Sequence, residues 1–115
     1  MATESDEILT GERCYIKELI NSTDHQNASL ARCRVSPGVL TQLHDLSVHE
    51  WYVIQSGEGE MFVGDAPGYP VAPGDIVSIP ARTAQQIRNT GADDLIFECL
   101  CMPRFDDAGY RSLED

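Results

Sequence analysis

Four cysteines carry the most reactive side chains in this sequence, because a thiolate can ligate a metal ion or act as a nucleophile. Cys14, Cys33, Cys99 and Cys101 show no CxxC spacing, which is the spacing typical of zinc and redox sites. Cys99 and Cys101 stand two residues apart in the apolar run LIFECLCM, so a strand would place them on one face. Two interpretations stay open: thiol chemistry or metal ligation, and small apolar side chains buried in a reducing compartment. We favour the second.

The composition limits the partners that such a chain can have. With 115 residues the chain has room for one domain, and 42% hydrophobic residues suffice for one buried core. Eight Lys and Arg residues against nineteen Asp and Glu give a net charge of -11, which repels polyanions. Basic residues form no cluster in the sequence, so we expect neither a nucleic acid nor a membrane surface as a partner.

The N-terminal sequence bears on location. MATESDEILTGER is acidic and polar, whereas a secretory signal has a basic start and an apolar run. No apolar stretch approaches the roughly 18 to 20 residues that cross a bilayer. We therefore expect a cytoplasmic location.

The elements that must position any site are expected to be short strands. Glycine and proline divide the middle of the chain into apolar segments without a long helical stripe, and GEG at positions 57–59 predicts a hairpin. Strands are expected at 29–35, 50–54, 60–64, 69–71, 75–79, 85–89 and 95–102. This spacing predicts an all-β sandwich or barrel at 29–104, with an N-terminal arm or edge strand (1–28) and an acidic C-terminal tail (105–115).

Two runs in this region resemble the motifs of a known family. GVLTQLHDLSVHEWYVIQSG, residues 38–57, resembles the first cupin motif, G(X)5HXH(X)3,4E(X)6G, and GDIVSIPARTAQQIRN, residues 74–89, resembles the second, G(X)5PXG(X)2H(X)3N. The residues in register are Gly38, His44, Glu50, Gly57, Gly74, Pro80 and Asn89. The resemblance covers about residues 29–104 and implies a single-domain cupin fold, a double-stranded β-helix that forms a jelly-roll-like barrel.

The resemblance also implies a metal site, of which this sequence keeps only a part. The family binds its metal through both histidines of HXH, the glutamate of the first motif and the histidine of the second. Here His44 and Glu50 stand at two of these positions, Leu46 and Gln85 replace the other two histidines, and Arg82 replaces the glycine of PXG. The implied metal ligands are therefore His44, Glu50 and Gln85. One imidazole, one carboxylate and one amide oxygen would bind Fe, Mn, Ni or Zn more weakly than the full set.

Strand alternation predicts which other side chains share the interior of such a barrel. Inward faces are expected at 42, 44 and 46, at 50, 52 and 54, and at 85, 87 and 89. The expected substrate-binding residues are Gln42, Leu46, Tyr52, Arg82 and Phe97, with Trp51, Met61 or Arg34 as further candidates. Alternation directs His49 away from Glu50 unless a bulge intervenes, and Cys99 or Cys101 would add a thiolate if their face turned inward.

Three functions are compatible with these residues. In the first, a divalent metal supports dioxygenase, isomerase or lyase chemistry on a small polar metabolite, with His44 and Glu50 as catalytic residues. In the second, the barrel is a metal-free module that binds a small carbohydrate or acidic metabolite. In the third, His44 and Glu50 form a metal-free acid/base pair. Fold analogy does not choose among them.

Cupins commonly dimerise by pairing sheet edges, as the resemblance implies. The N-terminal segment CYIKELI, residues 14–20, could add a strand to a partner. We therefore expect a homodimer that binds a small-molecule ligand.

Overall fold

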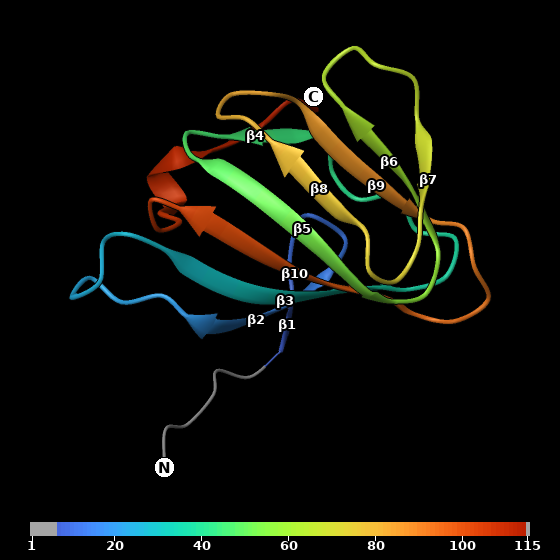
Figure 1. Ribbon diagram of the computed structural model, residues 1–115, viewed down its shortest axis with the longest axis horizontal. Coiled ribbons are helices and arrows are strands. Elements are labelled where there is room, and N and C mark those ends of the chain that lie inside the picture. The colour runs from blue at the N-terminus through green and yellow to red at the C-terminus, as the bar shows by residue number, and fades with distance from the viewer. Residues whose placement is uncertain (1–6, 115) are drawn as a thin grey trace.

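Two antiparallel β-sheets face each other in the structure, a computed structural model that describes residues 7–114 (Figure 1). The larger sheet has the order β1 (Ile8–Leu9), β2 (Tyr15–Ile20), β3 (Ser29–Val35), β10 (Leu95–Met102), β5 (His49–Ser56) and β8 (Ile76–Ile79). The smaller sheet has the order β11 (Tyr110–Ser112), β4 (His44–Leu46), β9 (Gln85–Asn89), β6 (Gly59–Val63) and β7 (Tyr69–Val71). This arrangement confirms the predicted all-β, jelly-roll-like barrel.

Helical structure is confined, within residues 7–114, to one 3-10 turn, η1 (Asp107–Gly109). No helix in that part of the chain is long and apolar enough to cross a membrane.

Period-two alternation decides which side chains enter the barrel. In β5 every second residue is buried from Glu50 to Ile54, and β10 buries every second residue from Leu95 to Cys101. In β9 the buried positions are Gln85, Ile87 and Asn89. Strands β5 and β10 are neighbours in the larger sheet and β9 belongs to the smaller sheet, so their inward side chains meet in one interior.

The turn between β5 and β6 requires glycine. Gly57 has a φ of 85°, in the left-handed region, and a Cβ atom at this position would lie 2.6 Å from the carbonyl oxygen of Asp94. A side chain would therefore collide with the β9–β10 connection. The predicted hairpin at residues 57–59 therefore requires glycine at position 57 for two reasons, the positive φ of the turn and the close approach of Asp94.

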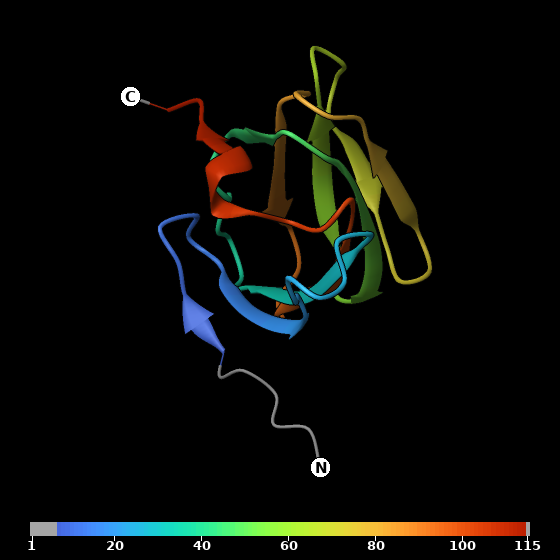
Figure 2. The same cartoon turned by 90° about the vertical axis from the view of Figure 1, so that its left-hand side faces the viewer.

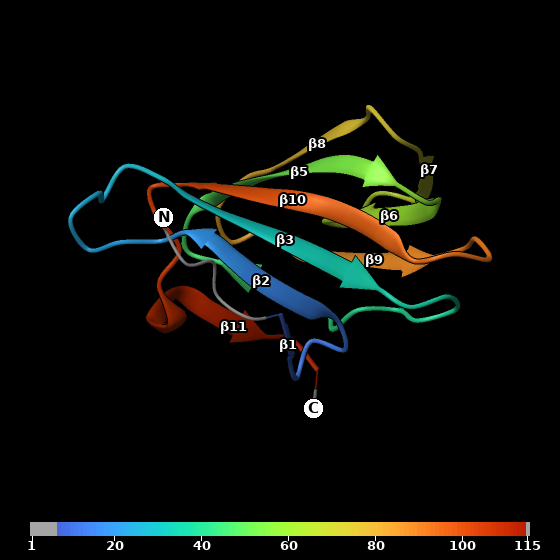
Figure 3. The ribbon, with the colours of Figure 1, turned by 90° about the horizontal axis from the view of Figure 1, so that it is seen from below.

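Strands from both ends of the chain pair with barrel strands. Strand β2 runs antiparallel to β3, and β11 runs antiparallel to β4. Figure 3 shows β2 beside β3 in the larger sheet, and Figure 2 shows the N-terminal and C-terminal segments at the same end of the barrel. The division of the chain at residues 28 and 104 stays a prediction, and its outermost residues, 1–6 and 115, lie outside the described ones.

The apolar core fills the opposite end of the barrel. Its fully buried members come from both sheets and include Val35, Ile54, Met61, Ile87 and Leu95. At the other end of the barrel, β5 and β9 place Glu50 and Gln85 in the interior, and β10 places Cys101 there.

Candidate functional site

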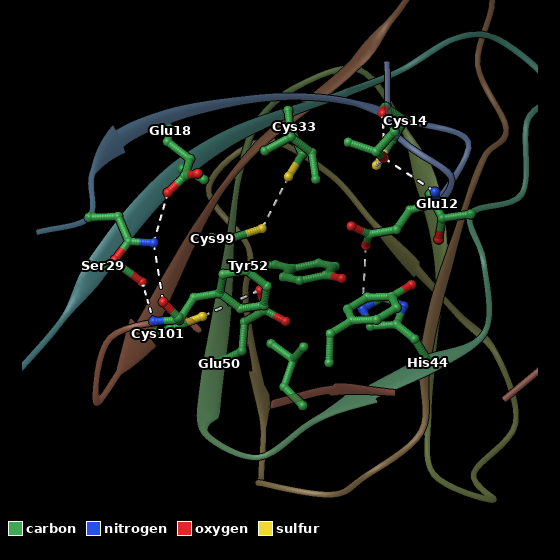
Figure 4. A pocket seen from close by; sticks show the side chains of 18 of the residues that line it. Glu12, Cys14, Glu18, Ser29, Cys33, His44, Glu50, Tyr52, Cys99 and Cys101 are labelled. Carbon is green, nitrogen blue, oxygen red and sulfur yellow. Dashed lines mark hydrogen bonds and ion pairs between the residues drawn. The ribbon is translucent and has the colours of Figure 1, made fainter. Parts of the chain in front are cut away.

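The polar end of the barrel contains a cavity of about 450 Å³. Strands β2, β3, β4, β5, β10 and β11 contribute to its wall, together with the segments that precede β2 and follow β10. Figure 4 shows that the labelled side chains come from several strands and surround one space. The titratable residues on this wall are Glu12, Cys14, Glu18, Cys33, His44, Glu50, Tyr52, Cys99, Cys101, Asp107 and Tyr110.

His44 is a wall residue, and one of its two ring nitrogens is engaged in a hydrogen bond. Its Nδ1 lies 2.8 Å from the backbone carbonyl oxygen of Gln42, an acceptor that Nδ1 can reach only as a donor. Burial lowers the pKa of His44, so its ring is neutral at pH 7 and Nε2 carries a free lone pair. The ring stacks on Tyr110, with centroids 4.9 Å apart, and this contact fixes its plane.

An acidic side chain, Glu12, lies near Nε2 of His44. Glu12 Oε1 lies 3.7 Å from His44 Nε2, and desolvation by burial raises the pKa of Glu12 to about 7. Glu12 precedes β2, and its backbone oxygen accepts a hydrogen bond from the Gln42 amide at 3.0 Å. That bond joins the N-terminal segment to Gln42, whose carbonyl oxygen accepts the hydrogen bond from His44. No sequence signal indicates Glu12, because this residue stands in a segment without strand alternation or a motif.

Glu50, on β5, is the buried acid of the site. Only 6% of the residue is exposed, and its Oε2 accepts a hydrogen bond from Cys101 Sγ at 3.7 Å. Its Oε1 is buried and has no hydrogen-bond partner among residues 7–114. Desolvation raises the pKa of Glu50 to about 7, although the Gln85 side chain acts in the opposite direction. A carboxyl group in this state can gain or lose a proton at neutral pH.

Of the expected substrate-binding residues, four lie on the cavity wall: Gln42, Leu46, Tyr52 and Phe97. Tyr52 and Phe97 stack with ring centroids 4.4 Å apart. Arg82 is not a wall residue, because its guanidinium group forms an ion pair with Asp45 at 2.9 Å.

The further candidates lie elsewhere. Trp51, Met61 and Arg34 are not wall residues. His49 also points away from the cavity, since its Nε2 is hydrogen-bonded to Ser78 Oγ at 2.8 Å and its ring stacks on Trp51.

Gln85 completes the expected ligand set but is engaged already. It is 1% exposed and lies opposite His44 in the register of β4 and β9. Its Oε1 accepts a hydrogen bond from the Tyr52 hydroxyl at 2.5 Å, and oxygen is the only amide atom that binds a cation. Across the described residues, no three His, Cys, Asp or Glu side chains are grouped so that they could hold a metal ion. A metal bound by His44 and Glu50 would therefore depend on the second lone pair of Gln85 Oε1 as its third protein ligand.

The four cysteines form part of the wall as free, buried thiols. The sulfur atoms of Cys33 and Cys99 lie 3.3 Å apart on neighbouring strands. Burial raises the pKa of Cys99 and of Cys101 above the usual range, so both are protonated at neutral pH. This environment agrees with the interpretation of these cysteines as small apolar side chains.

Sequence comparisons find relatives along most of the chain. The family profile described as "Cupin domain" matches residues 31–102. The uncharacterized protein MJ1618 of Methanocaldococcus jannaschii is 31% identical over 118 residues, which cover 97% of this chain and 94% of that protein. Auxin-binding protein 1 of Arabidopsis thaliana is 32% identical over 68 residues, which cover 52% of this chain. The match spans about a third of that protein's length, 34%.

Solved structures share the fold at lower identity. Pac13 of Streptomyces, described as a unique nucleoside dehydratase, has a TM-score of 0.80 at 16% identity, covering 96% of this chain and 86% of that one. Oxalate decarboxylase of Bacillus subtilis has a TM-score of 0.80 at 18% identity, covering 96% of this chain and 30% of that one. These structures confirm the double-stranded β-helix. With the profile over residues 31–102 and the archaeal relative along nearly the whole length, the chain belongs to the cupin family.

Proposed function

We propose that this cupin binds a small metabolite in the barrel cavity and converts it by metal-independent proton transfer, as an isomerase or a lyase. One observation carries the proposal: His44, Glu12 and Glu50 lie on the wall of one cavity of about 450 Å³. A neutral imidazole and two carboxyl groups that exchange protons near pH 7 can supply both a base and an acid.

The roles follow from the free atoms of each group. His44 Nε2 has a lone pair and removes a proton from the bound molecule, and Glu12, 3.7 Å away, stabilises the imidazolium that forms. Glu50, in its protonated form, gives its proton to the leaving or rearranging oxygen. In a lyase this pair of transfers releases water, and in an isomerase the proton returns to a different atom of the same molecule. Two enzymes with this fold, the nucleoside dehydratase Pac13 and oxalate decarboxylase, also act on small molecules.

The test is turnover in the presence of a chelator. A panel of hydroxylated molecules that includes uridine, aldoses and 2-hydroxy acids would be incubated with the protein in deuterated water and excess EDTA. Loss of water or uptake of deuterium would be followed by NMR. We expect turnover that His44→Asn and Glu50→Gln abolish. Glu58→Gln is the matched control, because Glu58 is exposed and is not a wall residue. Turnover that stops in EDTA and returns with Mn²⁺ or Fe²⁺ would contradict the proposal.

A metal-dependent enzyme is the second candidate, and the unpartnered Glu50 Oε1 favours it, because a buried carboxylate oxygen is a position that a cation could satisfy. Oxalate decarboxylase is described with Mn(II) centres. Elemental analysis of protein purified without a metal-binding tag, beside His44→Ala, decides between the candidates. Near-stoichiometric Fe, Mn, Ni or Zn that is lost in the variant would put the ligand set His44, Glu50 and Gln85 first.

A binding module without catalysis remains the third candidate. Ligand-dependent stabilisation in EDTA without any turnover would support it.

We also propose that the protein is a cytoplasmic homodimer. The edge strand β1 supports this proposal, since Ile8 and Leu9 are 62% and 59% exposed on it and an edge with apolar side chains can pair with a second copy. Light scattering at micromolar concentration tests the oligomeric state, and a clean monomer would contradict the dimer.

A further inference from the structure

The charged groups of the cavity wall all have one sign. Its acidic members are Glu12, Glu18, Glu50 and Asp107, and no lysine or arginine of residues 7–114 lies on this wall. A cavity that is lined by carboxyl groups of one sign and has low-dielectric walls focuses a negative potential. Such a potential attracts a cation and repels an anion.

An unsatisfied acceptor lies deep in this cavity. Glu50 lines the cavity and is only 6% exposed. Its Oε1 has no hydrogen-bond partner in the described chain. Figure 4 shows its carboxylate among the other wall residues, with Cys101 on one side. Buried acceptors in native proteins nearly always have a donor, so this oxygen marks a place for a donor that arrives with a ligand.

Glu12 provides a second acceptor near the same space. Its side chain is 23% exposed, and its Oε1 is 3.7 Å from His44 Nε2, which is too long for a good hydrogen bond. The Glu12 carboxylate therefore also has capacity for a ligand donor. An ammonium group has three donors and no acceptor, which matches the acceptor oxygens of these two carboxylates.

Beside these acids and a few uncharged polar side chains, the wall has aromatic and aliphatic surface. The stacked pairs Tyr52–Phe97 and His44–Tyr110 contribute four rings, and Leu30 and Leu46 contribute aliphatic surface. Aromatic rings hold an apolar molecule and also attract a cation at their faces. The cavity thus combines an apolar body with a negative polar end.

We propose that the ligand of this cavity is a small organic amine, bound as its ammonium ion, with the nitrogen donating to Glu50 Oε1 and Glu12 and an apolar or aromatic body against the ring pairs. This inference names the substrate class of the proposed function and rests on the same site. Both roles of Glu50 are compatible, because Oε1 accepts from the ammonium group while Oε2 carries the proton that Glu50 donates. It distinguishes amines from carboxylic acids, which would place a negative charge among four acidic side chains.

Isothermal titration calorimetry at about pH 8 tests the charge preference with two matched sets of probes. One set is phenethylamine, 2-phenylethanol and phenylacetate, and the other is n-butylamine, n-butanol and butyrate. Within a set the apolar body is shared and the charge changes. We expect at least one amine to bind about tenfold or more tightly than its alcohol, as charge-assisted hydrogen bonds predict, and neither carboxylate to bind.

Two variants assign the preference to residues. Glu50→Gln keeps the size of the side chain and removes its charge, so it should lower the affinity for the amine about tenfold and leave that for the alcohol unchanged. Glu12→Gln should have the same effect to a smaller degree. Glu58→Gln makes the same change at an exposed position outside the cavity, and it should change neither affinity. Circular dichroism of each variant checks that the fold is retained.

Three outcomes would overturn the amine proposal: equal affinity for amine and alcohol, tighter binding of a carboxylate, or no binding of either amine at millimolar concentration. The first two leave the proposed function intact, because a neutral or anionic ligand can still be the substrate of the acid/base site. Failure of the proposed function would look different. The wild type would bind the amine, Glu50→Gln would lose that binding, and no turnover would occur in EDTA. That result would support the amine ligand and contradict the proposed catalysis.

Discussion

Asn89 and Glu50 are buried polar side chains at opposite ends of the same barrel, and their surroundings differ. Asn89 is 1% exposed, donates from Nδ2 to the backbone oxygens of Val35 and Asp93 at 2.8 Å each, and accepts from the Gly91 amide at 2.9 Å. Glu50 is 6% exposed and leaves Oε1 without a partner in the described chain. A satisfied polar group stabilises the fold, whereas an unsatisfied one is kept for something that binds. We call the end with Asn89 the closed end, because its buried polar groups are paired within the protein. We call the end with Glu50 the open end, because a buried acceptor there is available to a ligand.

The largest effect is expected at the closed end. Asn89→Ala leaves two buried carbonyl oxygens and one amide without partners, which should lower the free energy of unfolding by about 3 kcal/mol. Urea denaturation followed by circular dichroism measures this. Gln55→Ala is the control, since Gln55 is an exposed amide that makes one hydrogen bond to Glu98, and it should change the value by less than about 0.5 kcal/mol. Equal losses in the two variants would remove the contrast between the two ends.

Glu50→Gln should raise the free energy of unfolding at neutral and higher pH, whereas Asn89→Ala lowers it. The pKa of Glu50 is raised from 4.5 to about 7, so the folded protein holds this proton while the unfolded chain releases it. Stability from this group is therefore present below about pH 4.5 and is lost as pH rises toward 7. Glutamine does not ionise, so the variant should be more stable than the wild type by about 3 kcal/mol at pH 8 and equal to it at pH 4. Urea denaturation at both pH values checks this, and a variant less stable at pH 8 would show that the charge is satisfied.

The two ends also differ in how far the sequence predicts them. Alternation alone places Glu50, Tyr52 and Gln85 inside the barrel, and the turn chemistry locates Gly57, because both signals are local to one strand or turn. Nothing local indicates that Glu12 lies beside His44. That contact depends on a backbone hydrogen bond between residues thirty positions apart, from the Gln42 amide to the Glu12 oxygen.

The same limit applies to the cavity as a whole. Tyr110, which stacks on His44, comes from a C-terminal strand that pairs with β4, whereas the sequence indicated only a tail. The unpaired Oε1 of Glu50 is a fact about partners in three dimensions. Sequence patterns predict the strands that bring a side chain inward, but they do not predict which inward groups stay unsatisfied.

A smaller effect is expected for Glu12→Gln. The pKa of Glu12 is raised by burial to about 7, so the variant should again gain stability above that pH. Because 23% of the side chain is exposed, water screens part of the penalty, and we expect a gain of about 1 kcal/mol at pH 8. Catalysis should fall, since His44 loses its charged neighbour. A pH profile of turnover that is unchanged in this variant would remove Glu12 from the acid/base group.

Arg82→Ala should have the smallest effect and tests the border of the open end. The sequence predicts Arg82 as a substrate-binding residue, but its side chain is 45% exposed and pairs with Asp45, which also binds Arg111 at 2.5 Å. Alanine also has a Cβ atom, so the backbone strain of its φ of 57° is unchanged, and Asp45 keeps one partner. We expect a loss below about 1 kcal/mol and, by calorimetry, unchanged affinity for the amine probes. A clear loss of affinity would mean that Arg82 leaves Asp45 to contact the ligand, as the sequence-based prediction of a substrate-binding role requires.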